Sequence, residues 1–189
     1  MNNHTTSITT NKKHHYRELL SIGFPIIIGQ LGTIILGFAD TLMIGHHSTP
    51  ELAAAGLVNN IFGLVFVSYM GFTYGLTPII GKLYGEERTD CIGQKVRNSF
   101  FANMLTGAIF TAVLILLYLN LAHIGQPEEL LSLIRPYFLV NLASVLFMGI
   151  FFTMKQFLDG IGKTKVAMWA MIGGNVVNIL GNWVLIYGV

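Results

Sequence analysis

Five stretches of this sequence contain no Lys, Arg, Asp or Glu and are mostly apolar. Each is long enough for an α-helix, which needs about 20 residues to cross the hydrocarbon core of a bilayer. They cover residues 19–39, 52–81, 98–127, 136–154 and 166–189. Hydrophobic residues make up 53% of the chain and charged residues 11%, a balance that excludes a soluble domain with a polar surface. The sequence therefore predicts an all-α, polytopic integral membrane protein with five transmembrane helices.

The positions of the basic residues predict the topology. Of the eleven Lys and Arg residues, Arg135 alone falls on one side of the predicted membrane, and the rest fall on the other. By the positive-inside rule, the N-terminus and the loops after the second and fourth helices are cytoplasmic. We expect a multi-pass protein of the inner (plasma) membrane, with the lipid bilayer as its surroundings.

The chain divides into two parts. Residues 1–15 are polar and lack apolar periodicity, which predicts a disordered cytoplasmic tail. Residues 16–189 form the transmembrane part, with helices expected at about 19–45, 52–80, 98–121, 133–157 and 166–188. Because the last helix ends on the outer side without a closing loop, we expect an incomplete transmembrane lobe.

Asp40 is the one acidic residue inside the apolar part of a predicted helix. A carboxylate is costly in hydrocarbon, so an acid there usually faces a cavity and serves as an ion or proton site. Gln30 and Thr33 lie on about the same helix face and are candidate supporting polar groups. The pattern predicts a transporter in which Asp40 accepts a proton or binds Na⁺.

The last predicted helix carries Asn175, Asn178 and Asn182 on one stripe. At about 1.5 Å per residue, Asn182 reaches nearly the same depth as Asp40. Amide oxygens can ligate a hard cation, and amides also join transmembrane helices by hydrogen bonds. For the asparagines alone, joining helices is the favoured interpretation. The acid at matching depth makes Asp40, Asn178 and Asn182 the candidate cation or proton site, with Asn175 in support.

Pro25 lies in the cytoplasmic half of the first helix, where its missing N–H and its ring predict a bend. Two interpretations are equally favoured: a hinge, or a proline tolerated because neighbouring helices satisfy the freed carbonyl. Aromatic and Met residues are candidates to line a substrate site, although packing or lipid contact is favoured for each. These candidates are Met43, Phe62, Tyr69, Met148 and Phe151.

Catalytic and cofactor motifs are absent from the sequence. It contains no HExxH helix, no phosphate-binding Gly-Lys-Ser/Thr loop and no dinucleotide fingerprint. Cys91 is the only cysteine, so no cysteine metal cluster can form. We expect no enzyme activity, no cofactor, no nucleic-acid partner and no metal beyond Na⁺ at Asp40.

Motifs in several of the predicted helices resemble the multidrug and toxic compound extrusion (MATE) family. They are Pro25, Gln30, GFADTLMIG (37–45), ELAAAG (51–56), GLTP (75–78), LDGIGKTK (158–165) and NILGNWVLIYG (178–188). The resemblance implies twelve helices in two bundles of six, alternating access, and export of cationic, amphipathic compounds in exchange for H⁺ or Na⁺. This chain would be an N-terminal fragment with five helices of one lobe, inactive without the missing C-terminal lobe.

The resemblance also bears on the site. Some bacterial and archaeal members form a cation site from a helix-one aspartate and an asparagine and an aspartate on helix five. Asp40 and Asn178 match two of these positions, and Asn182 stands where those members carry the second acid. The coupling ion therefore stays open between H⁺ and Na⁺. Pro25 matches a helix-one proline that the family associates with bending.

Two alternatives remain open. A lipid-linked oligosaccharide flippase of the same superfamily would need a markedly cationic cavity for phosphates, whereas Lys155, near the inner boundary, is the one basic residue in the predicted spans besides Arg135 at the outer end. A non-transporting membrane scaffold subunit would tolerate replacement of Asp40 by Asn or Leu.

Overall fold

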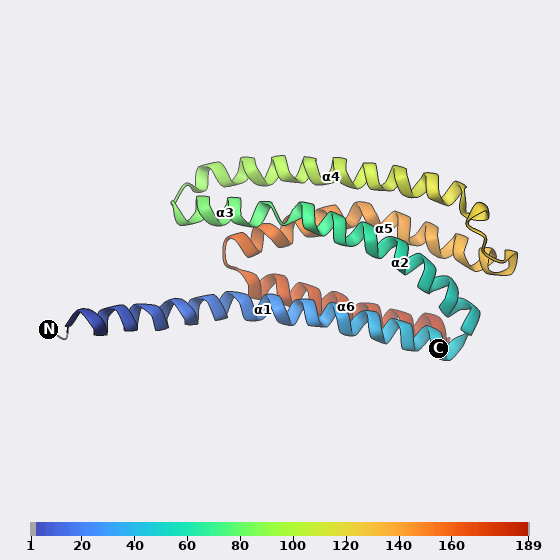
Figure 1. Cartoon of the computed structure of the whole chain (residues 1–189), viewed down its shortest axis with the longest axis horizontal. Helices are drawn as coiled ribbons and strands as arrows, with labels where there is room; N and C mark the ends of the chain where they lie inside the picture. The colour runs from blue at the N-terminus through green and yellow to red at the C-terminus, as the bar shows by residue number, and fades with distance from the viewer. Residues whose placement is uncertain (1–2, 189) are drawn as a thin grey trace.

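The computed structural model describes residues 3–188, with side chains from residue 16 onward except at positions 124 and 187, and all of its regular elements are helices (Figure 1). They are α1 (Asn3–His47), α2 (Thr49–Thr73), α3 (Leu76–Gly85), α4 (Thr89–Leu119), the short 3₁₀ helix η1 (Leu121–Ile124), α5 (Glu128–Gly160) and α6 (Thr164–Tyr187). Five helical segments of the described chain are long and apolar enough to span a membrane, with α2 and α3 counted together. The predicted all-α class with five spans is confirmed.

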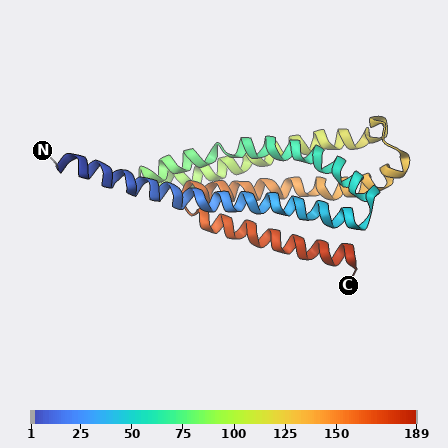
Figure 2. The ribbon, with the colours of Figure 1, turned by 60° about the horizontal axis from the view of Figure 1, so that its bottom comes forward.

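The helices form two groups. Helices α1 and α6 run side by side along most of the length of α6, while α2, α3 and α4 pack against α5 (Figures 1 and 2). The groups are joined where α2 leaves the end of α1 and where α5 turns into α6. The N-terminus and the α3–α4 and α5–α6 connections lie toward one end of the molecule, and the α1–α2 and α4–α5 connections lie at the opposite end. The basic residues thus collect toward one end, as the predicted topology requires.

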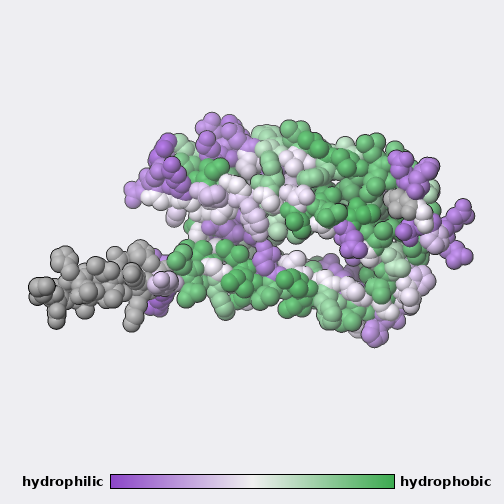
Figure 3. Space-filling model, in the orientation of Figure 1, coloured by the Kyte–Doolittle hydropathy of each residue, from purple (hydrophilic) through white to green (hydrophobic). Residues whose placement is uncertain are grey.

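The surface is apolar along the middle of the bundle. Figure 3 shows hydrophobic residues over the central part of both groups and hydrophilic residues toward the two ends. Large apolar side chains such as Leu64, Val177 and Leu185 are exposed, the last at 83%. In water such a surface would be unstable. In a bilayer these side chains contact lipid tails, which are equally apolar, so their exposure costs no free energy.

The predicted second helix is in fact two helices. Helix α2 ends at Thr73, and α3 begins at Leu76. The cause is Pro78, because a proline ring inside a helix collides with the carbonyl four residues earlier, here that of Tyr74. Pro78 instead lies in the first turn of α3, where a backbone N–H would have no helical partner. The predicted boundary 52–80 is corrected to these two elements.

Other helices begin earlier than predicted. Helix α5 starts at Glu128 because Pro127, with φ −56°, precedes two acidic residues that interact favourably with the positive end of the helix. Helix α1 starts at Asn3 and so covers most of the segment 1–15 for which the sequence predicts disorder; extending an existing helix costs less than starting one. Pro25 lies inside α1, which continues on both sides of it.

A buried polar network joins α2, α4 and α5. The Tyr69 hydroxyl donates to the carbonyl of Asn103, whose side-chain amide donates to Thr153 Oγ1 at 2.7 Å. Thr153 in turn donates to the carbonyl of Gly149 at 2.7 Å. A Cβ added at Gly149 would collide with the Tyr69 hydroxyl and the end of Met104. Gly149 therefore allows the close approach that this network needs.

We expect Gly149→Ala to destabilise the protein by about 1–3 kcal/mol, because the added methyl group must displace the Tyr69 hydroxyl. Gly173→Ala is the matched control, since a Cβ at this mid-helix position in α6 meets nothing within 4 Å. The stability of both variants is measured in detergent as the temperature at which half of the protein is denatured. Equal effects of the two substitutions would contradict the packing role of Gly149.

Candidate functional site

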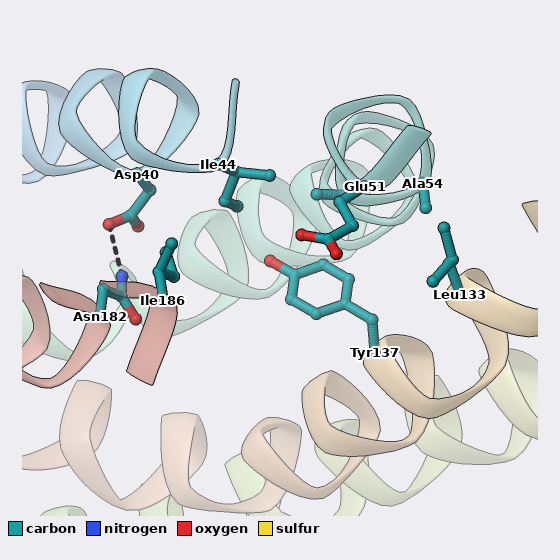
Figure 4. Close-up of a pocket in the computed structure, with 9 residues that line it drawn as sticks. Asp40, Ile44, Glu51, Ala54, Leu133, Tyr137, Asn182 and Ile186 are labelled. Atoms are coloured by element: carbon teal, nitrogen blue, oxygen red, sulfur yellow. Dashed lines mark hydrogen bonds between the residues drawn. The ribbon is translucent and has the colours of Figure 1, made fainter. Parts of the chain in front are cut away.

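A cavity of about 300 Å³ lies near the α1–α2 connection, in the seam between the α1–α6 pair and helices α2 and α5 (Figure 4). We call it the outer cavity. It is lined by Asp40, Ile44, Glu51, Ala54, Ala55, Leu133, Tyr137, Asn182 and Ile186. Four helices contribute to its walls, so a relative movement of the two groups would change its shape.

Three of the predicted site residues form a hydrogen-bonded chain. The side-chain amide of Asn182 donates to Asp40 Oδ1 at 2.8 Å and to Asn178 Oδ1 at 3.0 Å. Asn178 and Asn182 lie on successive turns of α6, and α6 runs in the same direction as α1, which places Asn182 beside Asp40. Asp40 is half-buried, whereas Asn178 is exposed. The predicted match in depth between Asp40 and Asn182 is confirmed.

The predicted supporting residues lie elsewhere. Gln30, Thr33 and Asn175 line a second cavity of about 390 Å³, which we call the inner cavity, between the same helices but nearer the α5–α6 turn. Gln30 donates to the Tyr74 hydroxyl at 3.1 Å, and Thr33 donates to the carbonyl of Gly29 at 3.3 Å. Because Gln30 precedes Asp40 by ten residues, about 15 Å of helix separates them. The polar stripe of α1 therefore serves two cavities.

The aromatic and Met residues that were candidates to line a substrate site lie in different parts of the bundle. Met148 and Phe151 line the inner cavity, together with three further phenylalanines. Tyr69 is fully buried in the network between α2, α4 and α5. Phe62 packs edge to face on Phe138, with the ring centroids 5.0 Å apart. Met43 is not among the residues that line the outer or the inner cavity.

Sequence reasoning missed Glu51 as a residue of the outer cavity. Ser48 caps α2 by accepting a hydrogen bond from the backbone N–H of Glu51 at 3.4 Å. The side chain of Glu51 lies 2.9 Å from His47 Nδ1. In Figure 4 it faces the cavity near Tyr137, across from Asp40. The available signal was the Ser-x-x-Glu capping pattern, which places Glu51 in the first turn after α1 ends.

Sequence reasoning also missed an ion pair. Lys155 Nζ lies 2.8 Å from Asp159 Oδ2, and each side chain is only 5% exposed. Lys155 lines the inner cavity. The available signal was the i, i+4 spacing of a base and an acid on one helix.

The oxygen atoms around Asp40 are of the kind that hard cations prefer. Asp40 supplies a carboxylate, Asn182 beside it supplies a neutral amide oxygen, and Glu51 brings a second carboxylate to the same cavity. Within residues 3–188, no group of three or more His, Cys, Asp or Glu side chains is arranged to hold a metal ion. A carboxylate in this position has the chemistry to bind and release a small cation or a proton.

Comparison with known proteins identifies the family. The MatE family model matches residues 25–184. The chain is 30% identical over 172 residues to "Probable multidrug resistance protein NorM" of Photorhabdus laumondii, covering 91% of this chain and 38% of the relative. It is 31% identical over 175 residues to "Multidrug resistance protein PmpM" of Pseudomonas aeruginosa, covering 91% of this chain and 36% of the relative.

Two solved structures share the fold. A MOP superfamily transporter from Pyrococcus furiosus superposes with a TM-score of 0.82 at 22% identity, and an outward-facing multidrug resistance MATE family transporter superposes with 0.80 at 22%. In each case the match covers 90% of this chain and 38% of the other. The chain thus spans well under half the length of the relatives it matches. The helical bundle, its apolar surface and the match of the MatE model over residues 25–184 together show that this chain belongs to the multidrug and toxic compound extrusion family.

Proposed function

We propose that this chain forms part of a secondary active antiporter that exports cationic amphipathic drugs or toxic compounds in exchange for H⁺ or Na⁺. The observation that carries the proposal is the hydrogen bond from Asn182 to Asp40, in a cavity between two helix groups of a membrane-spanning bundle. An acid in such a position has no packing role that an apolar residue could not fill. Its use is to change charge when the coupling ion binds.

The arrangement supports exchange at Asp40. Asp40 carries the one formal charge of the hydrogen-bonded group that it forms with Asn178 and Asn182. An ion that binds Asp40 neutralises this charge. Asn182 orients the carboxylate, and Asn178 orients Asn182 by accepting its second N–H. The site is part of the seam between the two helix groups, so binding can bias how those groups pack.

Alternating access needs two bundles that move against each other. We infer that this chain forms most of an N-terminal lobe that works beside a C-terminal lobe, as the 38% coverage of the relatives suggests, and that it is inactive alone. We place it in the inner (plasma) membrane with the N-terminus in the cytoplasm, because the basic residues collect toward that end.

The flippase alternative receives less support. It needs several cationic groups to bind phosphates. Of the described residues that line the outer and inner cavities, Lys155 is the one basic residue, and Asp159 pairs with it. The scaffold alternative gives no reason for a carboxylate at Asp40.

We expect Asp40→Asn to abolish ion-coupled export, because the amide cannot take up or release a charge. Asp90→Asn is the matched control, since Asp90 is exposed in the first turn of α4 and lines neither cavity. Dye efflux from proteoliposomes, with the protein at its full natural length and an imposed H⁺ or Na⁺ gradient, measures both variants. Full activity of Asp40→Asn would refute the role of Asp40.

We expect Asn182→Leu to change the ion concentration for half-maximal export about tenfold, since a hydrogen bond to a charged group is worth about 1.5–3 kcal/mol. Loss of this bond destabilises the charged form of Asp40, so less H⁺ is needed if H⁺ drives export, whereas loss of the amide oxygen means that more Na⁺ is needed if Na⁺ does. Asn178→Leu should have a smaller effect, because Asn178 reaches Asp40 only through Asn182. Titration of the driving ion in the same proteoliposomes distinguishes the two. A larger effect of Asn178→Leu would show that Asn178 does not act on Asp40 through Asn182.

A further inference from the structure

A groove lies between the start of the apolar part of α1 and the first turn of α6. It has a volume of about 550 Å³ and is lined by Arg17, Leu20, Ser21, Phe24, Pro25 and Lys165. We call it the basic groove. None of its residues lines the outer or the inner cavity, so it is separate from the site of the proposed export function.

Two basic side chains reach the basic groove from different helices. Arg17 belongs to α1, Lys165 belongs to the first turn of α6, and both are exposed. Among the residues whose side chains the structure describes, the ion pairs are formed by other bases, so neither Arg17 nor Lys165 has an acidic partner there. Glu18 follows Arg17 but does not line the groove, because consecutive helical residues point in different directions. The groove therefore presents two uncompensated positive charges.

Both basic residues lie at the edge of a membrane span. The first stretch without charged residues begins at residue 19, two positions after Arg17, and the last begins at residue 166, directly after Lys165. Basic residues at such a boundary lie near the charged headgroups of the lipids. The positive end of the α6 dipole is also beside Lys165, since α6 begins at Thr164. An anion at this level would meet three sources of positive potential.

An apolar track leads from the basic groove toward the middle of α1. Leu20 and Phe24 line the groove. Ile27 and Leu31 follow Phe24 at helical spacing, so they continue the same face of α1. All four side chains are more than half exposed. In Figure 3 the surface of α1 is hydrophobic directly beyond the hydrophilic residues near its start. An acyl chain can lie along this track while its headgroup stays in the groove.

We propose that the basic groove binds an anionic phospholipid. Arg17 and Lys165 hold its phosphate from two sides, and Leu20 and Phe24 contact the first part of an acyl chain. A guanidinium pairs with a phosphate through two parallel hydrogen bonds, and the ammonium group of Lys165 adds a second, compact charge. Because the lipid contacts both α1 and α6, it stabilises the packing of this helix pair. The inference does not depend on the export function.

The charges of the basic groove select among lipids. A choline or ethanolamine headgroup carries its own cation, which two basic side chains repel, whereas a glycerol headgroup leaves the lipid with a net negative charge. Ser21 donates its hydroxyl to the carbonyl of Glu18 at 2.9 Å, so its oxygen can still accept a hydrogen bond from a glycerol hydroxyl. A soluble phosphate would gain nothing from the apolar track. Phosphatidylglycerol is therefore the lipid that matches the groove.

Native mass spectrometry of the purified protein at its full natural length, in detergent, measures lipid binding directly. The probes are phosphatidylglycerol and phosphatidylcholine with identical acyl chains. We expect phosphatidylglycerol to bind about thirtyfold more tightly, which corresponds to about 1 kcal/mol for each basic residue beside an anionic lipid. The double variant Arg17→Gln/Lys165→Gln should remove this preference and leave the binding of phosphatidylcholine unchanged. The exchange Arg17→Lys/Lys165→Arg should retain the preference.

Lys82→Gln/Arg88→Gln is the matched control, because it removes two exposed charges from the α3 end and the α3–α4 turn, outside the basic groove. Equal losses in the two double variants would show that net charge alone attracts the lipid and would overturn the proposal. So would equal binding of the two lipids, or a preference that persists in Arg17→Gln/Lys165→Gln, as expected if another part of the full-length protein covers the groove. Displacement of phosphatidylglycerol by an equal concentration of glycerol phosphate would indicate a site for soluble anions and would also overturn it.

Discussion

Helices in a bilayer gain little by burying apolar side chains against one another, since lipid tails are equally apolar. What holds this bundle is close backbone approach and hydrogen bonding between helices. The network of Tyr69, Asn103 and Thr153 provides both, with Gly149 making room for it. This constraint explains why buried polar residues lie at the helix contacts, while many leucines and valines lie on the outside.

The same constraint explains the seam. Helices α1 and α6 pack closely on each other, as do α4 and α5, but the two groups share fewer contacts. The seam therefore retains two cavities, and three charged residues of the described spans line them. Asp40 and Glu51 line the outer cavity, and Lys155 lines the inner one. Charge is kept where it can meet an ion or a ligand rather than lipid.

Membership of the family can be set beside the acidic residues of the outer cavity. Similarity to the solved transporters at 22% identity establishes the fold, and the MatE match establishes membership. Positions 178 and 182 are asparagines, so α6 contributes amide groups and no carboxylate beside Asp40. A second acid, Glu51, enters the same cavity from α2 instead. The outer cavity thus contains two carboxylates from different helices.

The amino-acid sequence by itself determined the five spans, because the cost of unsatisfied polar groups in hydrocarbon leaves a long apolar segment no alternative to a helix. It also determined that Asp40 and Asn182 lie at nearly the same depth along their helices, since the rise per residue of an α-helix is constant. Only the tertiary structure decided which polar residues share a cavity. It separated Gln30, Thr33 and Asn175 from Asp40, and it turned Glu51 and Lys155 inward. These outcomes depend on how helices rotate and cross, which is set by contacts between residues far apart in the chain.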